Sequence, residues 1–123
     1  MISFEERVIG NEIIADFLDW EKRFDDYEQG FVYKVPNNFE VNTGWLEMDP
    51  EGFTFDNDWN WIHYLWDELH RKVCIPMVRD NNHLKWIRPI IQETKKAIVW
   101  GHKETVYKNM VELIKLYNSQ FTQ

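Results

Sequence analysis

The stretch that decides the fold is DWNWIHYLWDEL, residues 58–69, because it has the clearest helical pattern in the chain. Asp58 is a good N-cap, and its negative charge suits the positive end of a helix dipole. At 100° per residue, the apolar side chains between Trp59 and Val73 span an arc of about 160°. The pattern predicts a helix that buries its Leu and Ile side, holds Trp59 and Trp61 at the two borders, and ends at Pro76.

Two further helices are expected, one near each end of the chain. Asn11 is a competent N-cap, and the apolar residues that follow it at helical spacing predict a short helix. That helix either continues to Gly30 or breaks after Asp19, because residues 22–28 are nearly all charged. A second pattern predicts a helix over Lys103–Asn118, with Glu104 and Lys108 as an i,i+4 ion pair. Its expected apolar face consists of Val106, Met110, Leu113, Ile114 and Tyr117.

The middle of the chain has the signals of short strands. Residues 31–35 are β-branched and aromatic, and residues 39–41 form a second candidate strand before a turn at 42–44. Residues 45–48 and 52–55 flank Asp49-Pro50-Glu51, which predicts a hairpin. Together these segments predict a small antiparallel sheet.

Residues 77–100 allow two interpretations. Leu84, Ile87, Ile91 and Ile98 suit a helix that Asn82 could cap, but Pro89 would interrupt its first turns. We therefore favour a strand or loop around 86–91 and a strand at 96–100. The expected fold is α+β, with a small antiparallel sheet packed against about three helices in a single domain, 1–123.

Composition excludes several classes of protein. Cys74 is the only cysteine among the 123 residues, so an intrachain disulfide and a Cys-based zinc site are both impossible. No apolar run approaches the roughly 18 residues of a membrane span, and no secretory signal is recognisable. We therefore expect a cytoplasmic protein that makes no contact with membrane.

The net charge of −7 conceals an asymmetry along the chain. Residues 1–68 carry a net charge of −13, whereas residues 69–123 carry +6. The total disfavours a protein that coats duplex DNA, because both partners would be negative. The basic half could still contact a polyanion, or it could dock on an acidic half within the molecule or in a homodimer.

The sequence predicts no catalytic residues and no cofactor, because it contains neither a Ser-centred elbow nor a Gly-rich phosphate loop. One weak metal candidate is the trio His63, Asp67 and His70, which share a helix face at i, i+4 and i+7. The alternative interpretation of that trio is a solvated polar face. Residues 56–60 begin like a calcium loop, but Trp61 stands where an EF-hand needs Gly, so helix capping explains them better.

The candidate partner-binding residues are aromatic side chains and cations. The basic residues between Arg71 and Lys96 surround Trp86, a mixture that could grip phosphate and stack a base, or could face an acidic surface. The aromatic residues at the borders of the central helix could also contact a partner. The full set is Trp59, Trp61, Trp86, Lys85 and Arg88.

Two segments, FDNDWNWI at 55–62 and VELIKLYN at 111–118, carry a family resemblance. The chain resembles small uncharacterised proteins of gut-type bacteria and their tailed phages, which show a capped Trp-x-Trp helix start and a similar final helix. Residues 11–17 and 44–48 also fit, whereas 74–100 do not. This chain has Asp58 where the family's cap is Ser or Thr, and Ile62-His63-Tyr64 where the family has Leu-Met-Pro. The resemblance implies a short first helix and a mobile-element origin, and it supplies no activity.

These observations favour a non-enzymatic phage or mobile-element accessory protein that binds another protein through acidic and aromatic surface. A second hypothesis is a single-stranded nucleic-acid contact through the basic C-terminal half. A third is a metal-dependent hydrolase that uses His63, Asp67 and His70.

Overall fold

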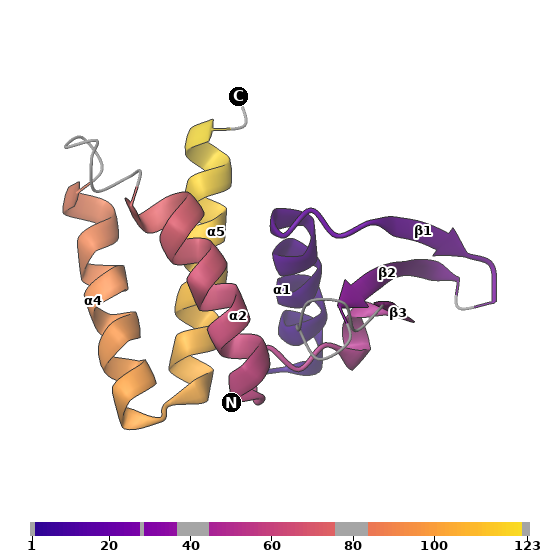
Figure 1. The fold of residues 1–123 in the computed structure, drawn as a ribbon, viewed down its shortest axis with the longest axis horizontal. Helices are drawn as coiled ribbons and strands as arrows, with labels where there is room; N and C mark the ends of the chain where they lie inside the picture. The colour runs from indigo at the N-terminus through magenta and orange to yellow at the C-terminus, as the bar shows by residue number, and fades with distance from the viewer. Residues whose placement is uncertain (1, 28, 37–44, 76–83, 122–123) are drawn as a thin grey trace. The chain divides into compact units, whose positions relative to one another are not determined.

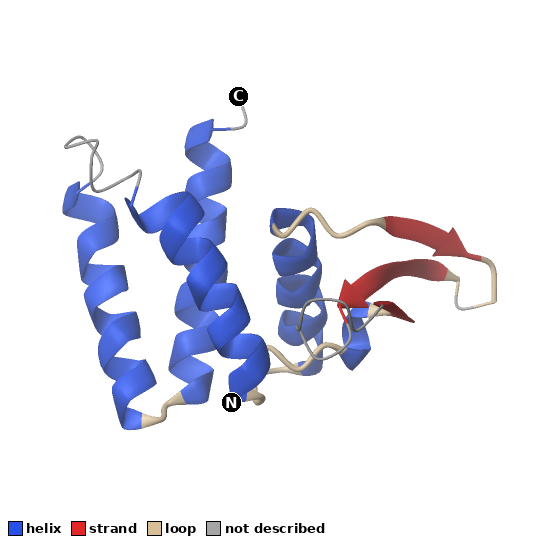
Figure 2. Ribbon diagram, viewed as in Figure 1, coloured by secondary structure: helices blue, strands red, loops and turns tan. Residues whose placement is uncertain are grey.

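The computed structural model describes residues 2–27, 29–36, 45–75 and 84–121, and in these ranges it contains four α-helices and a three-stranded antiparallel sheet (Figures 1 and 2). The predicted α+β class is confirmed. The chain divides into two compact units, Met1–Thr54 and Phe55–Gln123. We call them the sheet unit and the helical unit. Whether they act together as the one domain expected over 1–123 stays a prediction.

The sheet unit begins with helix α1 (Phe4–Phe17). The Ser3 hydroxyl caps it by accepting a hydrogen bond from the Glu6 N–H at 3.1 Å. The predicted start near Asn11 is wrong, because Ser3 provides an earlier cap and Asn11 is buried inside the helix. The helix stops near Asp19 and does not continue to Gly30, so the shorter of the two expected helices is the right one. Asp19 adopts a φ of 59°, and the Trp20 N–H donates to the Ala15 carbonyl.

The sheet has the order β1-β2-β3, with β1 (Lys22–Asp25), β2 (Gly30–Pro36) and β3 (Trp45–Met48). The sequence predicted the two strands β2 and β3 but missed β1, whose segment is mostly charged. That segment forms an edge strand, where charged side chains are tolerated because they face solvent. Phe24 pairs with Phe31 across β1 and β2, and Val35 pairs with Leu46 across β2 and β3.

The predicted hairpin around Asp49-Pro50-Glu51 is wrong. Residues Pro50–Gly52 form a 3₁₀ turn capped by the Asp49 carboxylate, and 53–55 form no strand. Phe53 and Phe55 are fully buried instead. The predicted strand at 39–41 and the turn at 42–44 lie outside the described residues.

Polar side chains tie the 3₁₀ turn to α1. The buried Asn11 amide donates to the Pro50 carbonyl at 2.8 Å and to the Phe53 carbonyl at 3.3 Å. Arg7 donates to the Glu51 carbonyl at 2.6 Å and also to that of Phe53. These bonds satisfy carbonyls that no strand partner reaches. Phe53 then packs edge-on against Trp20, at 5.6 Å between centroids, and against Tyr33, at 5.8 Å.

The helical unit opens with α2 (Trp59–Leu69), which confirms the central prediction. The Asp58 carboxylate accepts from the Asn60 N–H at 2.9 Å, and the predicted inner face is buried at Ile62, Leu65, Leu69 and Val73. The helix continues through a π turn (His70–Cys74) to Ile75. The predicted stop at Pro76 lies outside the described residues.

Residues 84–100 form helix α4 (Leu84–Trp100), so the strands favoured at 86–91 and 96–100 are wrong. Pro89 lies in the second turn, where its missing N–H removes one helical bond. Burial outweighs that loss, because Ile87, Ile91, Thr94 and Ala97 recur at helical spacing and are all buried. The alternative helical interpretation of this segment was therefore the right one.

Helix α5 (Lys103–Phe121) follows α4 after a tight turn, and it confirms the predicted C-terminal helix. Gly101 adopts a φ of 78°, and the His102 N–H donates to the Ala97 carbonyl at 2.9 Å. The turn sends α5 back alongside α4 (Figure 1). Val106, Met110, Leu113 and Ile114 are buried as predicted, and Lys108 pairs with Glu104 at 3.1 Å.

Candidate protein-binding surfaces

The two predicted border residues of α2 are partly occupied by contacts within their own unit. Trp61 packs edge-on against Phe55, with 4.9 Å between ring centroids. Trp59 stacks on His63 at 5.6 Å, and the Lys103 ammonium lies 5.5 Å from the Trp59 ring centre. Both indoles are half-buried. Each therefore offers only part of its ring to a partner.

The predicted basic site is only partly described. Arg88 is exposed on α4, whereas the side chains of Lys85 and Trp86 lie outside the described part. Arg71 and Lys72 both pair with the Glu68 carboxylate, at 2.7 Å and 3.3 Å. Burial acts to raise the pKa of Glu68, but the hydrogen bonds from Arg71 and Lys72 outweigh it and leave the pKa below its usual value. The cations at the end of α2 therefore pair within their own helix.

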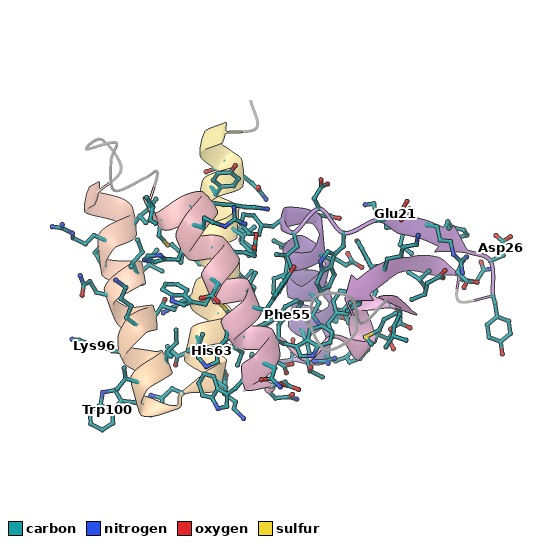
Figure 3. All side chains as sticks on the ribbon, in the orientation of Figure 1. Glu21, Asp26, Phe55, His63, Lys96 and Trp100 are labelled. Carbon is teal, nitrogen blue, oxygen red and sulfur yellow. The ribbon has the colours of Figure 1, made fainter. Side chains whose placement is uncertain are left out.

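The structure does not bring the predicted metal trio together as a ligand set. His63 lies against Trp59, His70 lies 5.9 Å from the ring of Trp66, and Asp67 is exposed. Figure 3 labels His63 on α2. Across the described residues, no three His, Cys, Asp or Glu side chains are grouped so that they could hold a metal ion. The helical spacing alone suggested this site.

Cys74 is a buried thiol in the π turn. Burial raises the pKa of this thiol to about 11, and the charge of Lys95 offsets that rise only in part. The reactive thiolate is therefore scarce at neutral pH. Cys74 therefore packs as a small buried residue.

One face of the sheet is covered by paired charges. Arg23 Nε donates to Glu47 Oε2 at 2.9 Å, and Lys34 Nζ lies 2.9 Å from a Glu21 carboxylate oxygen. The hydrogen bond with Glu47 raises the pKa of Arg23, and that with Glu21 raises the pKa of Lys34. These residues line an open pocket of about 210 Å³, with the buried Val32 at its base. The two acids on this face are therefore paired with cations of their own unit.

The opposite face of the sheet carries a surface that the sequence analysis missed. Phe24 and Phe31 form a cross-strand pair at 5.7 Å between centroids, and each is about half exposed. Leu46 belongs to the same face, and Tyr27 in the adjoining turn is 92% exposed. We call Phe24, Tyr27 and Phe31 the aromatic patch. Leu46 lies further along the sheet, opposite Val35. Figure 3 labels Asp26, which precedes Tyr27 in the turn of the β1–β2 hairpin.

The aromatic patch lies on the same face of the sheet as buried core residues. Tyr33 and Val35 share its face and are buried in the core of the sheet unit. The Lys22 ammonium lies 5.0 Å from the Phe31 ring centre and 5.9 Å from that of Tyr33. Strand alternation from Tyr33 could have assigned Phe31 to this face. Phe24 could not be assigned, because its strand was not recognised.

No family model, curated protein or solved structure shows a significant match to the chain. No described helix is both long and apolar enough to cross a membrane. The function therefore has to be inferred from the surfaces themselves.

Proposed function

We propose that this chain is a non-enzymatic accessory protein of a phage or mobile element, and that it binds another protein through the aromatic patch. The main observation behind this proposal is the cross-strand pair of Phe24 and Phe31. About half of each ring is exposed, and Tyr27 in the adjoining turn is almost fully exposed. Aromatic side chains of this kind dominate the energy of protein interfaces, because they bury large areas at small entropic cost. The single buried thiol suits action in a reducing compartment such as the cytoplasm.

The charge of the sheet unit indicates the chemistry of the partner. Residues 1–54 contain 13 acidic and 4 basic side chains, a net charge of −9. Asp26 is exposed in the turn that carries Tyr27. A partner with a basic surface would be drawn to this unit, and the aromatic patch would then supply the desolvated centre of the contact. A basic groove that otherwise holds nucleic acid is one surface of this kind.

Side chains, rather than the strand edge, are the binding element in this proposal. β1 is an edge strand, but its sequence Lys-Arg-Phe-Asp places three charges beside the one aromatic residue. Charged edge strands discourage the addition of a further strand. At β1, the apolar area offered to a partner is therefore the face of the hairpin.

The test is photo-crosslinking from the turn. A Tyr27→p-benzoylphenylalanine protein is irradiated in lysate of its natural host, and the crosslinked partner is identified by mass spectrometry. The Phe24→Ser/Phe31→Ser variant with the same crosslinker should lose at least about nine-tenths of that product, as expected for hot-spot residues. Ile75→Ser is the matched control, because it removes an exposed apolar side chain from the helical unit and should leave the product unchanged.

The result that contradicts the proposal is an equal yield from wild type and from the Phe24→Ser/Phe31→Ser variant. Circular dichroism of each protein checks that the folded fraction is the same.

The other two hypotheses lack this support. The nucleic-acid contact was predicted for Trp86 and the basic residues between Arg71 and Lys96. The side chains of Lys85 and Trp86 are not described, and the contact stays a prediction. The metal-dependent hydrolase would need His63, Asp67 and His70 to converge, and the described residues show no such group.

A further inference from the structure

Helix α4 carries an exposed basic and apolar face. Arg88, Gln92, Lys95 and Val99 are all exposed, and at 100° per residue they fall within an arc of about 60°. Val99 is 81% exposed, and Trp100 next to it is 74% exposed. Lys96 and Trp100 extend this face on one side, and both are labelled near the end of α4 in Figure 3. We call these six residues the α4 face.

The cations of the α4 face are not neutralised locally. Elsewhere, Arg23, Lys34, Arg71 and Lys108 each pair with a carboxylate. Among the described residues, Arg88, Lys95 and Lys96 form no ion pair. An exposed Val-Trp pair beside three uncompensated cations is a docking surface for an acidic, partly apolar partner.

Helix α1 of the same chain carries a face of that chemistry. Glu5, Ile9, Glu12 and Asp16 are exposed, and they repeat the i, i+4, i+7, i+11 spacing of Arg88, Gln92, Lys95 and Val99. Ile9 is 57% exposed in the middle of this acidic stripe. Within the described residues, Glu5 and Glu12 form no ion pair, while Asp16 accepts from Tyr33 and lies 3.5 Å from Lys22.

We propose that the α4 face binds helix α1 of a second copy of this chain. The two stripes have the same length and spacing and opposite charge, and each contains an exposed aliphatic residue that the contact would bury. Two different surfaces meet in such a contact, so it is heterologous and produces either a closed ring or a longer chain of copies. The proposal involves residues separate from the aromatic patch, so it stands or falls independently of the proposed function.

The first test is the mass of the purified full-length protein by sedimentation velocity. The wild type should be larger than a monomer at about 100 µM and low ionic strength, and it should dissociate as salt rises from about 0.05 M to about 0.5 M, because charge attraction is screened. A concentration-independent monomer at low salt would overturn the proposal. A monomer would also be observed if the two faces met within one molecule, and that outcome would overturn the proposal as well.

The decisive test is a pair of charge-reversed variants. Glu5→Lys/Glu12→Lys makes α1 basic, and Lys95→Glu/Lys96→Glu makes the α4 face acidic. Each variant alone should associate at least about tenfold more weakly than wild type, because its two faces then repel. Mixing the two variants in equal amounts should restore the wild-type mass, because each basic helix then meets an acidic one. A mixture that stays monomeric would contradict the pairing.

A variant without a change of charge tests whether association can be weakened while the protein stays folded. Val99→Ser removes only exposed apolar area and should weaken association by about threefold to tenfold while the circular dichroism spectrum is unchanged. Leu46→Ser, which removes an exposed apolar side chain from the sheet unit, is the matched control and should not alter the mass. A single-stranded oligonucleotide is titrated against wild type and Lys95→Glu/Lys96→Glu. Saturable binding that needs these lysines, in a protein that remains monomeric, would assign the α4 face to nucleic acid instead.

Discussion

The sheet unit and the helical unit are stabilised in different ways. In the sheet unit, the side chains of Arg7 and Asn11 reach across some 40 residues of sequence to the carbonyls of Glu51, Pro50 and Phe53. In the helical unit, the core is formed by periodic apolar stripes on α2, α4 and α5. The first unit adds a few specific long-range polar contacts to its apolar core, whereas the second relies on the continuous packing of helical stripes. Single substitutions should therefore reveal different weaknesses in each.

Truncation of the helical core should have the largest effect. Leu113→Ala on α5 removes a fully buried side chain and leaves a cavity among its neighbours, so the free energy of unfolding should fall by about 3 kcal/mol. Urea denaturation followed by circular dichroism measures the change. Val99→Ala on the exposed side of α4 should change it by less than about 0.5 kcal/mol. Similar values for the two variants would refute the assignment of the core.

The polar anchor of the sheet unit should come next. Asn11→Ala removes the buried amide that donates to the Pro50 and Phe53 carbonyls. These carbonyls keep their bonds from the Phe53 N–H and from Arg7, so the free energy of unfolding should fall by about 1 to 2 kcal/mol. Glu12→Ala, one residue along on the exposed side of the same helix, is the control. If Asn11→Ala lowers the free energy of unfolding no more than Glu12→Ala does, the hydrogen bonds of Asn11 do not stabilise the sheet unit.

The cap of α2 should have a smaller effect. Asp58→Ala removes the acceptor for the Asn60 N–H and should cost about 1 kcal/mol, whereas Asp58→Asn keeps an oxygen acceptor and should cost clearly less. Thermal unfolding of the three proteins compares them. Equal losses from both substitutions would show that charge, and not capping, is the main contribution.

Tyr33 should contribute a pH effect in alkaline solution. Burial, together with the charge of Asp16, raises the pKa of Tyr33 to about 12 from its ordinary value of 10.0. The unfolded chain therefore releases this proton first, so stability should fall as pH rises from 10 towards 12. Tyr33→Phe should show a shallower decline across that window, and no pH-dependent difference from wild type at neutral pH. A decline of the same slope in both proteins would exclude Tyr33 as a cause.

The same contrast between units explains which features the sequence could predict. Helices α2 and α5 have long amphipathic patterns, so their positions and inner faces were predicted correctly. The start of α1 was missed because Asn11 looks like a local cap but serves a distant turn. β1 was missed because its charges are satisfied by residues such as Glu47, which lies on another strand.

The errors in α4 and in the candidate site have related causes. Pro89 was given more weight than the buried face that Ile87, Ile91 and Thr94 form. The exposed pair of Phe24 and Phe31 depends on strand register, which local pattern did not reveal. For His63, Asp67 and His70 the local pattern was visible but misleading, because a shared helix face does not by itself make three side chains converge.

The most direct test of the central claim compares stability and partner capture in one variant. If the aromatic patch is a binding surface, Phe24→Ser/Phe31→Ser should abolish the Tyr27 crosslink in a protein that stays folded. The free energy of unfolding should fall by about 2 to 4 kcal/mol, from the lost ring pair and the buried half of each ring. Capture that persists at the wild-type level in this folded variant would contradict the claim.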